Sequence, residues 1–97
     1  MSFSRTFLDK SIAIIGELPT DNIDQLANEL CRVRQGGGRL FIIGVGASAD
    51  HASHAVNDFR KLCDFKAYTP TDNVSELTAG TNDEGWNTTV LALPAWA

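Results

Sequence analysis

Apolar positions in the first 36 residues recur at intervals of three and four, the period of an amphipathic helix. One series predicts a helix that begins near Phe3 and is ended by Pro19. A second predicts a helix capped by Thr20 or Asp21 and stopped by glycines 36–38, because residues without a Cβ atom disfavour further helix. The apolar positions are Phe3, Phe7, Leu8, Ile12, Ile15 and Leu18, then Ile23, Leu26, Ala27, Leu30 and Val33.

The period changes at residue 39. Residues 39–43 (RLFII) form a continuous apolar run flanked by glycines, which predicts a fully buried strand of a parallel sheet. The turn 44–48 (GVGAS) leads into a helix over 49–62, and a weaker strand over 65–68 completes a βαβ unit. The inner face of that helix carries Ala52, Ala55, Val56, Phe59 and Cys63. Residues 72–77 predict a loop entering a short helix, and residues 82–85 predict a further turn.

The predicted class is therefore α/β, with two N-terminal helices followed by a βαβ unit of a parallel sheet. We expect one domain over residues 1–97, divided into a helical pair at 1–36 and a βαβ core at 39–90 that holds the site. The tail after Trp86 lacks a partner segment, and two short strands alone do not make a stable sheet. We expect a fragment or a truncated member of a longer fold.

Charge and composition indicate which kinds of partner the protein can have: nucleic acid, a membrane or another subunit. The net charge is −4 with no basic run, which excludes nucleic acid as a primary ligand. The longest apolar stretch is far below the roughly 20 residues of a membrane span, and no signal core follows Met1, so we expect a cytoplasmic protein without membrane contact. A chain of 97 residues buries a modest core, which favours a partner subunit.

The two cysteines and two tryptophans are expected to have structural roles rather than catalytic ones. Cys31 and Cys63 lack the spacing of a zinc or redox motif and are expected to be reduced, buried thiols. Trp86 and Trp96 are expected to anchor the core or an interface.

The glycine turn is the first candidate for a binding site. At the start of a helix, outward N–H groups and the helix dipole attract an anion, and glycines let a phosphate approach the main chain. Ser48 can add a hydroxyl; a tight turn without any ligand is the alternative. The string GVGASA also fits the dinucleotide pattern GxGxxA, but the only candidate for its acidic residue, Asp64, precedes the second strand.

The following helix carries the second candidate. His51, His54 and Asp58 fall within an arc of about 60° on the flank of the apolar stripe. His54 and Asp58 are four residues apart and can meet, which suits a proton-transferring pair or two ligands of zinc. The alternative is an ordinary surface contact.

Two segments together resemble a known family. GGRLFIIGVGASADHASHAVNDFRKL is similar to the glycine turn and helix of the SIS (sugar isomerase) domain, and most similar to its phosphoheptose isomerase branch. TDNVSELTAGTNDEGW resembles that branch's next block, in which a Thr-Asp loop leads to an Asn-Asp-x-Gly-aromatic turn. The resemblance covers roughly residues 3–87 and implies a flavodoxin-like sandwich, a homotetramer, and isomerisation of a ketose phosphate, sedoheptulose 7-phosphate, to an aldose phosphate.

The resemblance also implies roles for individual residues. Asp58 is the base on the enediol path, and His54 with Asp58 can bind zinc. The family's loop aspartate corresponds to Asp72 or, without a gap, to Asn73. The substrate-binding residues implied are Gly46, Ala47, Ser48, His51, Asp72, Asn73, Asn82 and Asp83.

Several departures from the family leave rival interpretations open. Val45 replaces an Asn that faces the sugar, Ala47 replaces a glycine, and Asp58 is one methylene shorter than the usual Glu. The family is about twice as long, and its second half carries a phosphate loop and another catalytic His, so a premature stop or shifted reading frame is one explanation of this chain. The rivals to the isomerase are a noncatalytic SIS module that binds a phosphosugar or a protein, and a dinucleotide-binding fragment.

Overall fold

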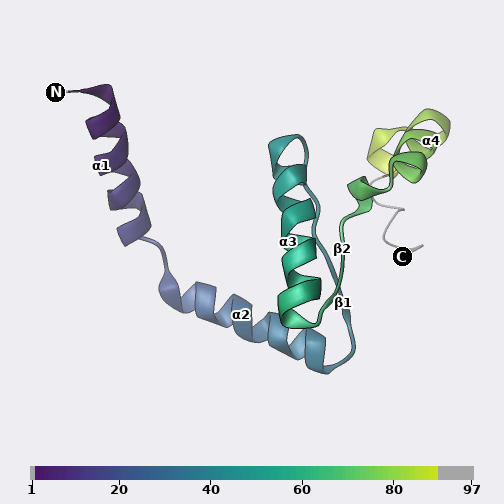
Figure 1. The fold of residues 1–97 in the computed structure, drawn as a ribbon, viewed down its shortest axis with the longest axis horizontal. Coiled ribbons are helices and arrows are strands. Elements are labelled where there is room, and N and C mark those ends of the chain that lie inside the picture. Colours follow the sequence, from purple (N-terminus) through teal and green to yellow (C-terminus); the bar gives the residue numbers. More distant parts are fainter. Residues whose placement is uncertain (1, 90–97) are drawn as a thin grey trace. The chain divides into compact units, whose positions relative to one another are not determined.

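The computed structural model describes residues 2–89 and shows helices alternating with two short strands (Figure 1). The chain divides between Cys31 and Arg32 into two compact units. In chain order the elements are α1 (Phe3–Gly16), α2 (Thr20–Gln35), β1 (Arg39–Phe41), α3 (Ala47–Cys63), β2 (Lys66–Tyr68), the 3-10 turn η1 (Pro70–Asp72) and α4 (Val74–Glu84). The described chain is therefore of mixed α/β class.

The two predicted N-terminal helices are present. Helix α1 begins at a serine cap, where the Ser2 hydroxyl accepts a hydrogen bond from the Arg5 N–H at 3.1 Å. It ends at Gly16, three residues before Pro19, so the predicted end was slightly late. Helix α2 carries Asp21 in its first turn and Arg32 and Arg34 in its last, as the helix dipole favours. No residue of α1 or α2 is buried.

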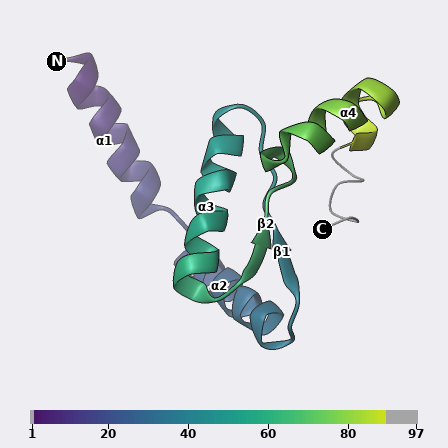
Figure 2. The same cartoon turned by 45° about the vertical axis from the view of Figure 1, so that its right-hand side comes forward.

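The sheet consists of β1 and β2 in parallel register, so the predicted βαβ unit is present. Leu40 pairs with Ala67, and the ladder continues beyond β1 through the Ile42 N–H, which donates to the Tyr68 carbonyl at 3.0 Å. Both strands are shorter than predicted. The full burial predicted for β1 was wrong, since Arg39 is exposed and Leu40 half-buried. Figure 2 shows α3 lying along the sheet, and a strand covered on one face keeps side chains of its other face accessible.

Helix α3 packs on the sheet through small side chains. Its buried residues are Ala52 and Val56, and they belong to a core that also holds Phe65 and the fully buried Ala67. The helix starts two residues earlier than predicted, at Ala47, and ends at Cys63, where Asp64 caps it in a left-handed conformation with φ of 54°. Such small residues let helix and sheet approach closely but bury little apolar area.

An arginine links α3 back to the sheet. The Arg60 Nε donates to the Ala67 carbonyl at 2.6 Å, and its guanidinium lies 5.0 Å from the centre of the Tyr68 ring. Arg60 is an exposed residue, yet this hydrogen bond and the cation–π contact join it to β2.

Helix α4 corrects the prediction for residues 82–85. Asn82 and Asp83 lie in its last turn, and the chain changes direction only at Gly85, whose φ is 91°. Residues without a Cβ atom adopt this conformation readily, which explains why the turn occurs at that position. Residues 86–89 are again helical.

The cysteines are less buried than expected, and Trp86 does not serve as a core anchor in the part of the chain that the structure describes. Cys31 and Cys63 are free thiols, as predicted, but Cys31 is exposed and Cys63 is half-buried. Trp86 keeps 46% of its surface exposed, so it does not anchor a core within the described residues, and Trp96 lies outside them. No helix in residues 2–89 has the length and apolar character needed to cross a membrane.

The passage from β1 to α3 depends on Gly44. A Cβ atom at this position would overlap the backbone of Ser48 and lie 2.6 Å from the Ala49 nitrogen. Backbone atoms cannot rotate away as a flexible side chain can. Any other residue at position 44 must therefore push the first turn of α3 away from the end of β1.

We expect Gly44→Ala to lower the free energy of unfolding by about 2 kcal/mol or more, because the added methyl meets backbone atoms. The matched control is Gly16→Ala at the end of α1, where an added Cβ meets nothing within 4 Å. The control should be neutral or stabilising by up to about 1 kcal/mol. Urea unfolding followed by circular dichroism and tryptophan fluorescence measures both, and equal stabilities would contradict the close approach.

Candidate functional site

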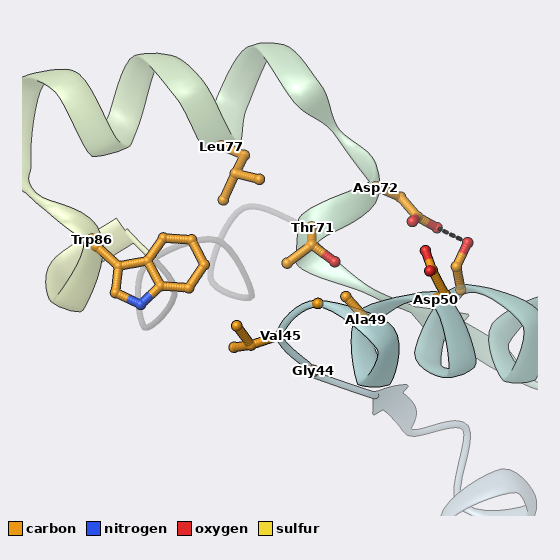
Figure 3. Close-up of a pocket in the computed structure, with 10 residues that line it drawn as sticks. Gly44, Val45, Ala49, Asp50, Thr71, Asp72, Leu77 and Trp86 are labelled. Atoms are coloured by element: carbon orange, nitrogen blue, oxygen red, sulfur yellow. Dashed lines mark hydrogen bonds between the residues drawn. The ribbon is translucent and has the colours of Figure 1, made fainter.

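A pocket of about 360 Å³ lies where the β1–α3 turn faces the segment that follows β2 (Figure 3). Its walls come from the turn, the first two turns of α3, η1, α4 and the residue after Gly85. The lining residues are Gly44, Val45, Gly46, Ala49, Asp50, Ser53, Thr71, Asp72, Leu77 and Trp86. Ligands of α/β proteins typically bind at this carboxyl end of the strands.

The start of α3 exposes backbone donors beside the pocket. Its cap residue is Gly46, with φ of 64° and no side chain to accept a hydrogen bond from the first turn. The N–H groups of Ala49 and Asp50 both donate back to the Gly46 carbonyl. Helix geometry leaves the N–H groups of Ala47 and Ser48 without an intrahelical acceptor, so they are the natural donors for an anion here.

The Ser48 side chain holds the turn together. Its hydroxyl accepts from the Val45 N–H at 2.8 Å and donates to the Val45 carbonyl at 2.9 Å. These two bonds close the glycine turn onto α3. The hydroxyl predicted to bind phosphate is thus engaged with the backbone, and Ser48 does not line the pocket.

One side of the pocket is acidic and hydroxylated. The Ser53 hydroxyl donates to the Asp72 carboxylate at 3.2 Å, which links α3 to η1 (Figure 3). Asp50 points into the same region from the first turn of α3. No basic side chain is among the described residues that line the pocket, so its field favours groups that donate hydrogen bonds and opposes anions.

The other side is apolar. Figure 3 shows Val45, Leu77 and Trp86 on the side away from the two carboxylates. Gly85 makes this possible, because its left-handed conformation turns the chain after α4 and brings Trp86 toward the glycine turn. The pocket thus combines one apolar wall with one wall of hydrogen-bond acceptors.

Of the residues predicted from the sequence, the structure brings Gly46 and Asp72 together at this pocket. Asn73 lies elsewhere: it caps α4, and its side-chain oxygen accepts from the Glu76 N–H at 3.0 Å. Between the two candidates for the family's loop aspartate, Asp72 is therefore the one at the pocket. The predicted residues outside the lining are Ala47, Ser48, His51, His54, Asp58, Asn73, Asn82 and Asp83, of which Asn82 and Asp83 hydrogen-bond to each other.

The His54–Asp58 pair is present but solvent-exposed. The His54 Nε2 lies 3.3 Å from the Asp58 Oδ2, as the i, i+4 spacing predicts. Their side chains are 78% and 47% exposed, and neither lines the pocket. Asp58 follows Asp50 by eight residues, about 12 Å along the helix axis. The pair therefore lies further along α3 than the pocket and is not part of the cavity.

Zinc does not fit the pair by itself. A protein zinc site uses three or four ligands in tetrahedral geometry, whereas this pair offers two. Within residues 2–89 no group of three or more His, Cys, Asp or Glu side chains is placed to hold a metal. A zinc ion at this pair would need one or two further ligands from outside the described residues.

Sequence reasoning missed several of the residues that line the pocket. Asp50 and Ser53 follow Gly46 by four and seven residues, so helical spacing alone places them on the face that begins at the turn. Thr71 is adjacent to the predicted Asp72. No local sequence pattern assigned Trp86 to the pocket, apart from its place at the end of the second family-like segment. Its position in space depends on the turn at Gly85.

Comparisons with known proteins add no assignment, since no protein-family model, curated protein or solved structure matches the chain. The dinucleotide alternative is not supported by the geometry. Asp64 caps the far end of α3, about 25 Å from the glycine turn along the helix axis, and precedes β2. The ribose-binding acid of that motif belongs after the second strand.

We expect Ser48→Ala to lower the free energy of unfolding by about 1 kcal/mol, because the Val45 N–H and carbonyl lose their partner. Ser75→Ala, at an exposed serine in the first turn of α4, is the matched control and should change stability by less than about 0.5 kcal/mol. Urea unfolding measures the difference. Equal effects of the two substitutions would show that the Ser48 hydroxyl does not hold the turn.

Proposed function

We propose that this chain carries the sugar-binding part of a sugar-phosphate isomerase of the SIS type, acting on a ketose phosphate such as sedoheptulose 7-phosphate. One observation carries the proposal. Every lining residue within the described range 2–89 belongs to one of the two segments that resemble the phosphoheptose isomerase branch, six to the first and four to the second. Segments separated in sequence that meet at one pocket are the expected arrangement of a shared ligand site.

In this proposal the phosphate binds at the start of α3. The N–H groups of Ala47 and Ser48 donate to it, and the positive end of the helix dipole stabilises its charge. The sugar carbons extend into the pocket, where the Asp72 carboxylate and the Ser53 hydroxyl bond to sugar hydroxyls. Phosphate and hydroxyl contacts together fix the substrate along α3.

The chemical step requires one base. A carboxylate removes a proton from C1 of the ketose, the C1–H electron pair forms the C1–C2 double bond, and the carbonyl oxygen takes a proton to give an enediol. The protonated carboxyl group then gives a proton to C2, which bonds through the electron pair of the C1–C2 double bond, while the C1 hydroxyl loses its proton to solvent and its O–H electron pair forms the C1 carbonyl of the aldose. Asp58 is the proposed base, and His54, 3.3 Å from it, is the proposed positioning partner.

A second candidate is a noncatalytic module that binds a phosphosugar. It is favoured by the position of the His54–Asp58 pair, which lies outside the pocket with both side chains exposed. A catalytic base must reach its proton within hydrogen-bond distance. The isomerase therefore needs the reacting carbons to extend along α3 from the pocket toward Asp58, whereas the noncatalytic module does not.

We extend the proposal to a homo-oligomer, which the family resemblance implies to be a tetramer. Large apolar side chains of α1, among them Phe3, Phe7 and Ile12, are more than half exposed in the structure. A partner subunit would remove such surface from water and could cover the face of α3 that carries His54 and Asp58.

We expect the 97-residue protein to incorporate solvent deuterium beside the carbonyl of sedoheptulose 7-phosphate, measured by NMR. Asp58→Asn should slow this exchange about 100-fold or more while leaving the Kd of the sugar phosphate within about threefold. Asp9→Asn, an exposed aspartate on α1, is the control and should leave the exchange rate unchanged.

The other outcomes separate the two candidates. Sugar-phosphate binding with no deuterium incorporation, and with a Kd unaffected by Asp58→Asn, identifies the noncatalytic module. Absence of binding to a panel of ketose and aldose phosphates contradicts both.

A further inference from the structure

Trp86 is a large aromatic side chain on the wall of a pocket. It lines the cavity together with Val45 and Leu77, and 46% of its surface is exposed. A tryptophan that serves only to stabilise a core is buried to a much greater extent. Apolar surface exposed inside a concavity is typical of a ligand site.

The position of Trp86 is set by the turn at Gly85 and by hydrogen bonds on either side of it. Gly85, at φ of 91°, turns the chain out of α4, and its N–H donates to the Thr81 carbonyl at 3.0 Å. The following residues are fixed by Thr89, whose hydroxyl and N–H donate to the Gly85 carbonyl at 2.8 and 3.1 Å. Thr89 is only 3% exposed, so a buried threonine ties the helical turn that carries Trp86 to Gly85.

The opposite wall has a different chemistry. Asp50, Ser53 and Asp72 present oxygen atoms to the cavity, and the lining described includes no cation. A second anionic group placed between Trp86 and these carboxylates would be repelled, whereas uncharged hydroxyls can donate to them. A carbon chain with hydroxyls on one side and C–H bonds on the other fits both walls.

We propose that Trp86 is a substrate-binding, specificity-determining residue whose ring packs against the C–H face of the sugar while Asp50, Ser53 and Asp72 bind its hydroxyls. The inference rests on the proposed function, because it assumes a sugar phosphate at this pocket. It adds a substrate class: sugars that carry a single phosphate, with an uncharged polyhydroxylated chain inside the pocket. Sugar bisphosphates and sugar acids with a charge at the far end are excluded by the carboxylates.

The test measures Kd by calorimetry for sedoheptulose 7-phosphate and for inorganic phosphate. Trp86→Ala should weaken sugar-phosphate binding about tenfold and leave phosphate binding unchanged, while Trp86→Phe should keep the Kd within about threefold. Val74→Ala, an exposed apolar residue of α4 outside the pocket lining, is the matched control and should change neither Kd. A sugar bisphosphate should bind at least about tenfold more weakly than the monophosphate.

A second measurement keeps the Trp86 side chain and follows its fluorescence. The chain has two tryptophans, so Trp96→Phe leaves Trp86 as the only one. Its fluorescence should change on addition of sedoheptulose 7-phosphate and not on addition of inorganic phosphate.

The results distinguish this inference from the proposed function. Sugar-phosphate binding with equal Kd in wild type and Trp86→Ala, or without a Trp86 fluorescence change, overturns the role of Trp86 and leaves the proposed function standing. No binding of any sugar phosphate by the wild type overturns both.

Discussion

Helix α3 can begin directly against the end of β1 because residue 44 has no side chain, and the candidate site depends on this contact. The backbone of Ser48 and Ala49 occupies the space that a Cβ atom of residue 44 would need. The Ser48 hydroxyl then closes the turn through two bonds to Val45. As a result Gly46 at the start of α3, the acidic Asp50 in its first turn and the segment after β2 all line one cavity. The N–H groups of Ala47 and Ser48, which lack intrahelical acceptors, follow directly after Gly46 in the chain.

The electrostatics of this cavity decide how a phosphorylated sugar could lie in it. Two carboxylates line one wall, and backbone donors lie at the edge near Gly46. A phosphate is favoured at the donors and disfavoured beside Asp50 and Asp72, whereas hydroxyls are favoured beside the carboxylates. The charge pattern therefore orients the ligand even though the lining described contains no lysine or arginine. The apolar wall formed by Trp86 adds contact area without adding charge.

The sequence predicted those features that local rules determine. The period of three and four located α2, whose observed bounds agree with its glycine stop, and the change of period at residue 39 located the βαβ unit. The end of α4 was missed because Asn82 and Asp83 favour turns, yet the redirection of the chain needs the positive φ that Gly85 supplies. Burial of β1 was overestimated because periodicity does not reveal whether a second layer covers the sheet.

The candidate site was predictable only in part, for similar reasons. Gly46 and Asp72 were found because a glycine turn and a family-like loop carry local signals. The Ser48 hydroxyl was assigned to a ligand, but the nearest acceptor and donor are those of Val45, within its own turn. Trp86 was assigned to the core or an interface and not to the pocket, because its position depends on how the chain turns after α4, which no local pattern encodes.

The most direct test of the account is a two-dimensional ¹H–¹⁵N NMR titration of the protein with sedoheptulose 7-phosphate. The account predicts shifts of backbone amides in both segments that line the pocket, around residues 44–53 and 71–86, with Ala47 and Ser48 among the largest because their N–H groups bind the phosphate. Saturating shifts confined to other parts of the chain, such as the cavity between Gly37 and Lys66, or no shifts at all, would contradict it.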